Sequence, residues 1–246
     1  MFFMSNSTLT PLSEEQIAFY YREGYLVVPG LVPLETVTQA REAFTAPIEG
    51  ERWTPGIFDY NQPEAADPLQ HRILVEPNVI AAVEQIFEAP ARVYYGMTAV
   101  VPANGGNGLP WHQDNQYGQM IPAALNTFVA LCEITPDKAI LWVAPKSHLL
   151  GTQPSKEAGG IYGGHRTGLV EPENGMPLPT VQPGDVCIFD RNTYHRSLRN
   201  ETNEHRYAYA AQYCAEYSRR ATTGQKDETR RPVRELQERW KDVLGL

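Results

Sequence analysis

The sequence predicts a mainly β domain, an antiparallel sandwich or barrel with flanking helices. Short segments rich in β-branched and aromatic residues dominate the chain after residue 90, and turn residues bound them. The helical patterns come before these segments and do not alternate with them, which argues against a parallel sheet built from βαβ units. The length of 246 residues suits one large domain, which we expect to span residues 1–246.

Residues 1–90 are expected to form a helical part that packs on the barrel. Ser13 and Gln16 are spaced as a capping box, and Gly24 is a typical helix stop. A short strand, Tyr25-Leu26-Val27-Val28, follows Gly24. Asn78 is expected to cap a third helix. The helices predicted in this part cover residues 13–23, 33–44 and 78–87.

Residues 91–217 contain the β core, and residues 218–246 form a C-terminal tail with one helix. The strands predicted in the core cover residues 91–101, 125–134, 139–144, 181–190 and 206–217. Pro232 near the first turn, with Val233, Leu236 and Trp240 on one face, predicts an amphipathic helix to residue 243.

Composition excludes several classes of partner. The formal net charge is −8, so neither a nucleic acid nor an anionic membrane is favoured. No apolar run is long enough to span a membrane. The three cysteines are odd in number and far apart, which predicts buried thiols and a cytoplasmic location.

Trp111-His112-Gln113-Asp114 raises the possibility of a metal site. In a strand, residues two apart point to the same face, so His112 and Asp114 could aim at one point while Gln113 points away. Non-haem Fe(II) oxygenases use two histidines and one carboxylate on one face. His195, just past the buried strand that follows Pro183-Gly184-Asp185, is the best candidate for the third ligand.

Arg206 opens a strand in which Arg206, Ala208, Ala210 and Gln212 share one face and three tyrosines share the other. A buried guanidinium needs an anion, and its fork suits a carboxylate. That anion could be Asp190 or Glu204 in a structural ion pair. The alternative is a small dicarboxylate held in the same cavity as the metal.

Together these residues resemble the phytanoyl-CoA dioxygenase family of iron- and 2-oxoglutarate-dependent oxygenases. The resemblance covers most of the chain: residues 9–30, the motif at 111–114, residues 125–148, and the step of eleven residues from His195 to Arg206. Two residues depart from the family pattern, because Lys146 and Ala139 stand where the family usually has glycine. His148, which follows in the same turn, is expected to be structural.

The resemblance implies a double-stranded β-helix, a cupin-like jelly roll. It implies Fe(II) held by His112, Asp114 and His195, with 2-oxoglutarate bound by Arg206 and Ser197 and oxidised by O2 to succinate and CO2. Related halogenases lack the carboxylate, so Asp114 favours hydroxylation or a related oxidation. Two alternatives stay open: a cupin-type metal-dependent hydrolase or isomerase without cosubstrate, and a ligand-binding barrel without catalysis.

The substrate is expected to be a small metabolite or a natural-product intermediate, with an oligomeric state that the sequence does not specify. Selectivity is expected from the loops at 46–72, 115–124 and 151–180. The residues predicted to line the substrate site are Trp53, Phe58, Tyr60, Asn115 and Tyr117. Three histidines, His71, His165 and His205, are expected at the surface or in structural roles. The C-terminal arginines Arg219, Arg220, Arg230, Arg231 and Arg234 are expected to form a solvated, ion-paired face and not a coenzyme A site.

Overall fold

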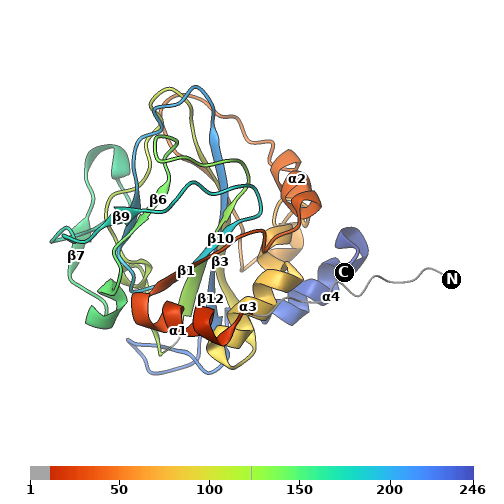
Figure 1. The fold of residues 1–246 in the computed structure, drawn as a ribbon. Coiled ribbons are helices and arrows are strands. Elements are labelled where there is room, and N and C mark those ends of the chain that lie inside the picture. The colour runs from red at the N-terminus through yellow and green to blue at the C-terminus, as the bar shows by residue number, and fades with distance from the viewer. Residues whose placement is uncertain (1–11, 123) are drawn as a thin grey trace.

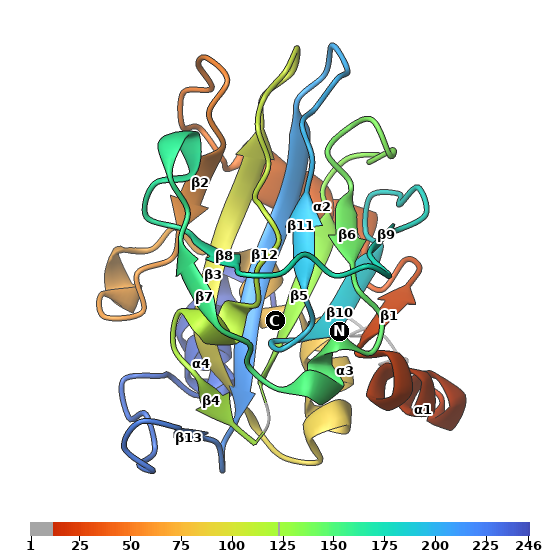
Figure 2. The same cartoon turned by 90° about the vertical axis from the view of Figure 1, so that its left-hand side faces the viewer.

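The computed structural model describes residues 12–122 and 124–246 and shows a jelly roll of two antiparallel sheets (Figures 1 and 2). The larger sheet has the order β1(Tyr25–Val28), β10(Val186–Asp190), β5(Ala124–Ala130), β12(Arg206–Ala215), β3(Ala91–Val101) and β2(Thr54–Ile57). The smaller sheet has the order β11(His195–Ser197), β6(Leu141–Val143) and β9(Met176–Pro177). Two short ribbons lie outside these sheets, β13(Arg219–Arg220) with β4(Met120–Ile121), and β7(Ser155–Glu157) with β8(Arg166–Gly168).

Helices lie beside the larger sheet, and α2, α3 and α4 cover the face that points away from the smaller sheet (Figure 1). The α-helices are α1(Glu14–Glu23), α2(Leu34–Glu42), α3(Pro77–Phe87) and α4(Val233–Leu244). The short 3₁₀ helices are η1(Pro63–Ala65), η2(Arg72–Val75), η3(Asp114–Gln116), η4(Ser147–Leu150) and η5(Gly160–Tyr162). In the described part of the chain, no helix combines the length and apolar character needed to cross a membrane.

Two hydrophobic cores flank the larger sheet. One core lies on its helical face, where Tyr209 and Tyr213 of β12 pack with residues of α3 and α4. The second core fills part of the space between the two sheets and includes Phe128, Leu141 and Phe189. The alternation predicted for β12 is therefore correct, because its tyrosines face the helices and Arg206, Ala210 and Gln212 line the cavity between the sheets.

The predicted helix signals are correct for α1 and wrong for α3. The Ser13 hydroxyl accepts a hydrogen bond from the backbone N–H of Gln16, and the side-chain oxygen of Gln16 accepts one from the backbone N–H of Ser13. Gly24 ends the helix in a left-handed conformation, with φ of 82°. Helix α3 begins earlier than expected: Glu76 is the N-cap and Pro77 occupies the first turn, so Asn78 already lies inside the helix. Proline suits this place because it lacks the N–H that the first turn leaves unbonded.

Four predicted strands are shorter than expected: β6 covers 141–143 and β12 covers 206–215, where 139–144 and 206–217 were predicted, and the other two lose four or more residues. The segment 125–134 stops pairing as a strand at Ala130, and the segment 181–190 begins to pair only at Val186. The side chain of Asp185 explains the second boundary, because it accepts hydrogen bonds from the backbone of Gln182 and of Gly30 and so fixes a turn before β10. Ile134 and Val181 keep a single isolated bridge.

A β-bulge interrupts β3 beside the cavity. Gln212 pairs with Tyr95 and Tyr213 pairs with Val93, so Tyr94 is an extra residue without a partner on β12. Side chains of adjacent strand residues normally point to opposite faces. Here Tyr94 and Tyr95 both line the cavity, while Val93 packs in the helical core. Bulges often re-aim side chains in this way near functional sites.

Ala139 and Lys146, the two departures from the family's glycines, both adopt left-handed backbone, with φ of 51° and 66°. This conformation costs an L-residue roughly 1–2 kcal/mol, whereas glycine adopts it freely. Lys146 is the simpler of the two positions to substitute, because its side chain is 59% exposed. Its ammonium lies 4.0 Å from the Glu23 carboxylate, at the limit of an ion pair.

We expect Lys146→Gly to raise the free energy of unfolding by roughly 0.5–1 kcal/mol, because the strain relieved exceeds the entropy that glycine adds to the unfolded chain. Urea denaturation measures the change. The matched control is Lys156→Gly in β7, where φ is not positive and glycine should destabilise. Equal destabilisation by both substitutions would contradict the prediction.

Candidate metal centre and cavity

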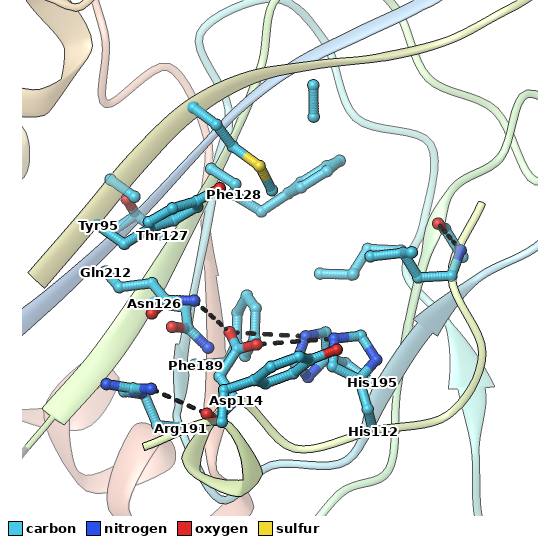
Figure 3. A pocket seen from close by; sticks show the side chains of 18 of the residues that line it. Tyr95, His112, Asp114, Asn126, Thr127, Phe128, Phe189, Arg191, His195 and Gln212 are labelled. Atoms are coloured by element: carbon cyan, nitrogen blue, oxygen red, sulfur yellow. Dashed lines mark hydrogen bonds and ion pairs between the residues drawn. The ribbon is translucent and has the colours of Figure 1, made fainter. Parts of the chain in front are cut away.

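The side chains of His112, Asp114 and His195 converge on one point (Figure 3). Their potential ligand atoms all lie within 4.8 Å of one another. Nε2 of His112 is 3.6 Å from Oδ1 of Asp114, and Nε2 of His195 is 3.8 Å from Oδ2 of the same carboxylate. These distances leave space for one ion between the three groups, at the edge of the cavity between the sheets.

Backbone pairing brings the two histidines together. The N–H of each donates to the carbonyl of the other, at 3.0 Å in both directions, in an isolated antiparallel bridge. Residues paired in this way present their side chains on the same face. Asp114 does not continue the strand as expected, because η3 begins there; the carboxylate reaches the histidines from the first residue of a 3₁₀ turn.

Each imidazole is held with Nε2 toward the common point. Nδ1 of His112 lies 2.7 Å from the carbonyl of Pro110, and Nδ1 of His195 lies 3.0 Å from the carbonyl of Thr193. A carbonyl can only accept, so Nδ1 carries the proton and Nε2 keeps its lone pair for a metal. Burial, followed by the neighbouring His195, lowers the pKa of His112 to about 4, so this ring is neutral at neutral pH.

Two side chains that the sequence interpretation missed hold Asp114 in place. Nε2 of Gln212 donates to Oδ2 of Asp114 at 2.8 Å, and Nη2 of Arg191 donates to the backbone carbonyl of Asp114 at 2.8 Å. The sequence places Gln212 on the same face of β12 as Arg206, six residues further on, but the sequence analysis gave it no role. No comparable signal marks Arg191, which follows the end of β10.

Gln113, between the two ligands, points away from the cavity as predicted and is fully buried. Its amide nitrogen donates to the carbonyls of Gly151 and Asn192, and its oxygen accepts from the backbone of Gln153. The metal motif is thereby fixed to the loop after η4 and to the turn before β11.

A cavity of about 430 Å³ extends from the three ligands, and both Arg206 and Ser197 line it. The Arg206 side chain is buried, and among the described residues no carboxylate lies within 4 Å of its guanidinium. Neither of the two carboxylates considered as a structural partner of Arg206 pairs with it. Glu204 pairs with Lys138, and Asp190 accepts a hydrogen bond from the backbone N–H of Asn192. Burial lowers the pKa of Arg206 to about 10, so the group remains charged at neutral pH.

Three of the five predicted substrate-lining residues, Trp53, Tyr60 and Tyr117, line this cavity. The prediction is wrong for Phe58, which is 1% exposed and packs edge-on against Trp240 in the helical core. It is also wrong for Asn115, whose amide binds Asn192 and the backbone of Met120. Both residues belong to the expected loops, but their side chains turn into the protein.

Two residues assigned to ordinary roles line the cavity instead. His165 lies edge-on to Trp53, with ring centroids 5.6 Å apart, and its Nδ1 is 3.4 Å from the Tyr117 hydroxyl. Arg230 is buried and lies over the rings of Tyr60 and Tyr94, so it is not part of a solvated C-terminal face. The turn at Asp227 holds it there through a 3.0 Å ion pair.

Asn126 of β5 is a further cavity residue that the sequence did not single out. It is 3% exposed, and neither its amide nitrogen nor its oxygen has a hydrogen-bond partner in the part of the chain that the structure describes. Figure 3 shows it beside Gln212 and Asp114, facing the same space as the metal ligands. Buried amides are normally satisfied, which points to a bound molecule as the partner of Asn126.

Two imidazole nitrogens and one carboxylate on one face are the donor set of non-haem Fe(II) oxygenases, and the residues present fit such an ion. This site, in a jelly roll with an unpaired guanidinium in the adjoining cavity, defines an iron- and 2-oxoglutarate-dependent oxygenase. The chain belongs to the phytanoyl-CoA dioxygenase (PhyH) family, whose model matches residues 20–208.

Individual relatives are distant. The chain is 26% identical over 240 residues to a protein of Caenorhabditis elegans named "Probable phytanoyl-CoA dioxygenase", with 82% of this chain and 75% of the relative covered. It is 24% identical over 226 residues to the ectoine dioxygenase of Sphingopyxis alaskensis, with 78% and 72% covered.

Solved structures share the fold. EvdO2 from Micromonospora carbonacea, in complex with 2-oxoglutarate, superposes with a TM-score of 0.68 at 18% identity, covering 90% of this chain and 97% of that chain. The epimerase SnoN, in complex with Fe3+ and alpha-ketoglutarate, gives 0.68 at 18% identity, covering 89% and 94%.

Gly108 offers a test of how closely this site is packed. A Cβ there would lie 2.3 Å from Oγ of Ser197 and 2.4 Å from its carbonyl oxygen. We expect Gly108→Ala to displace β11 and to weaken 2-oxoglutarate binding about tenfold, with a stability loss of roughly 1–3 kcal/mol. Calorimetric titration and thermal unfolding measure the two effects. Gly159→Ala, where nothing lies within 4 Å, is the matched control; similar behaviour of the two variants would contradict the prediction.

Proposed function

We propose that this protein hydroxylates a small metabolite or natural-product intermediate, using Fe(II), 2-oxoglutarate and O2 and releasing succinate and CO2. The observation that carries the proposal is the guanidinium of Arg206, buried and without a carboxylate partner among the described residues, in the cavity that also holds the three metal ligands. A dicarboxylate that chelates the metal at one end supplies the missing anion at the other.

Arg206 and Ser197 are proposed to hold the distal carboxylate of 2-oxoglutarate. Oγ of Ser197 already accepts a hydrogen bond from the backbone N–H of Leu109 at 3.2 Å, so its own proton is available for an anion. Arg206 lies over the Phe128 ring at 5.4 Å, which fixes the plane of the guanidinium. The unpartnered amide of Asn126 is proposed to bind the same molecule near the metal.

His112, Asp114 and His195 are proposed to hold Fe(II), which when bound supplies the open coordination positions and the redox chemistry of this class. Gln212 and the carbonyls of Pro110 and Thr193 orient the ligands. The presence of Asp114 supports hydroxylation or a related oxidation over halogen transfer. We also propose a cytoplasmic location, because the three cysteines are free thiols, which suit a reducing compartment.

The alternatives are less well supported. A cupin-type hydrolase or isomerase has no use for a second, unpaired cationic anchor beyond the metal, and that anchor is present in Arg206. A binding barrel without catalysis has no need for three ligands whose Nδ1 and carboxylate positions are all fixed by hydrogen bonds. Turnover without 2-oxoglutarate would favour the first alternative.

Arg206→Met is expected to weaken 2-oxoglutarate binding by about 2–5 kcal/mol, the usual cost of truncating one partner of a buried charge pair. Titration calorimetry on the Ni(II)-loaded protein measures this without turnover. Arg234→Met is the control, because its side chain is 75% exposed on α4, outside the cavity lining. An unchanged affinity in Arg206→Met would remove the basis of the proposal.

Substitution of a metal ligand is expected to reduce activity far more than substitution of Gln212, which only orients the ligand Asp114. His112→Ala and Asp114→Ala should abolish iron-dependent succinate production while unfolding stays cooperative. Gln212→Ala should retain activity but bind Fe(II) about 10–100-fold more weakly, as is usual when a group that orients a ligand is lost. Metal titration and a succinate assay test both expectations. Succinate production by either ligand variant would refute the assignment.

A further inference from the structure

We infer that the substrate of this cavity is a ring-containing monoanion, bound with its negative charge on the side of Arg191 and its ring against a wall of tyrosines. The inference rests on the proposed function and goes further by naming the chemical class of the substrate. It follows from the charges that line the cavity and from the way the aromatic side chains are held.

Four arginines of the described chain are buried, and they fall into two pairs. Arg92 and Arg230 each have a carboxylate within 4 Å, from Glu228 at 3.6 Å and from Asp227 at 3.0 Å. Arg191 and Arg206 have none within that distance in the described residues, and both line the cavity. Arg230 also lines the cavity, but Asp227 supplies its counter-ion. Arg191 and Arg206 are therefore the two buried cavity arginines whose counter-ion is left to a ligand.

Arg206 is accounted for by 2-oxoglutarate, whereas Arg191 is not. Arg191 is 1% exposed, and its Nη2 donates to the backbone carbonyl of Asp114. Its Nε and Nη1 are buried and have no hydrogen-bond partner among the described residues. Figure 3 shows it on the opposite side of Asp114 from the two histidine rings. Its charge therefore acts on the part of the cavity beside the metal centre and away from the histidines.

Charge accounting with both cofactors bound leaves an excess of positive charge. The two charges of Fe(II) offset the two of 2-oxoglutarate, and Asp114, the one carboxylate among the described lining residues, offsets Arg206. Arg196, between the rings of Trp111 and Trp142, is only half-buried, so solvent screens its charge. One buried charge, that of Arg191, is left without a counter-ion among the described residues. An anionic substrate is attracted in this low-dielectric space, and a cationic one finds no carboxylate to receive it.

The wall next to Arg191 is built for a flat ring. Arg191 lies over Tyr94 at 4.0 Å, Arg230 lies over Tyr94 at 4.0 Å, and Arg230 also lies over Tyr60 at 3.8 Å. The tyrosines and arginines thus form one alternating stack along the cavity. The Tyr94 hydroxyl is tied to the carbonyl of Gly118, so the stack is fixed before any ligand binds. Because the two guanidinium groups cover opposite faces of Tyr94, a ligand meets the edge of that ring, and edge-to-face contact is a favoured arrangement for a second aromatic ring.

Three probes of one shape test the inference: 2-naphthoate, 2-naphthalenemethanol and 2-naphthylmethylamine, which are anionic, neutral and cationic at neutral pH. Each is titrated into the Ni(II)-loaded protein at saturating 2-oxoglutarate, with tryptophan fluorescence and calorimetry as readouts. We expect naphthoate to bind about tenfold or more tightly than the alcohol, and the amine to bind most weakly. An amine that binds as tightly as naphthoate overturns the inference. Displacement of 2-oxoglutarate by naphthoate also overturns it, because the probe would then occupy Arg206.

Variants assign the preference to one residue. Arg191→Met should abolish the preference for naphthoate over the alcohol, which is measured as a ratio of two affinities at saturating Ni(II), because Arg191 also binds the backbone of Asp114. Arg191→Lys, which keeps the charge, should retain the preference, and so should the exposed control Arg234→Met. If Arg191→Met does not fold, Arg191→Gln, which also removes the charge, takes its place, and a preference for naphthoate that persists in folded Arg191→Gln overturns the inference. Persistence of the preference in folded Arg191→Met overturns the inference.

A separate titration of 2-oxoglutarate into the Ni(II)-loaded protein keeps the two proposals distinguishable. If 2-oxoglutarate does not bind, the proposed function fails. If it binds and the probes show no preference for the anion, only the inference about the substrate fails.

Discussion

The two backbone hydrogen bonds between His112 and His195 are the constraint on which the rest of the site depends. They join segments 83 positions apart in the chain and place both imidazoles on one face. Each ring then needs only one further bond, to a backbone carbonyl, to direct Nε2 at the metal. The carboxylate arrives from a 3₁₀ turn, and a side chain of the larger sheet steadies it. The metal position is therefore set by main-chain pairing, with side chains making the final adjustment.

The metal ligands and the cationic anchor could be predicted from sequence because each leaves a local trace. A histidine and a carboxylate two residues apart, and an arginine beside small residues on a strand, depend only on side-chain periodicity. The overall order of helices and strands was recognisable for the same reason. Gln212 was also within reach, since it repeats the period of Arg206 on β12.

The substrate side of the cavity could not be predicted, because it depends on packing between segments far apart in sequence. Phe58 and Asn115 lie in the expected loops, but partners elsewhere in the chain turn them inward. Arg191 and Arg230 became cavity residues only once the fold placed Tyr94 between them. Whether an arginine is paired is a property of three-dimensional neighbours, and composition does not record it.

The bulge at Tyr94 has a consequence for how this cavity can change. Because one unpaired residue separates Val93 from Tyr95, β3 places Val93 in the helical core and both Tyr94 and Tyr95 in the cavity lining. A single-codon deletion at this point would restore regular pleating on one side and remove the ring that both arginines share, without touching a metal ligand. We expect such a one-residue change in length to reshape the proposed substrate site while the three metal ligands keep their places.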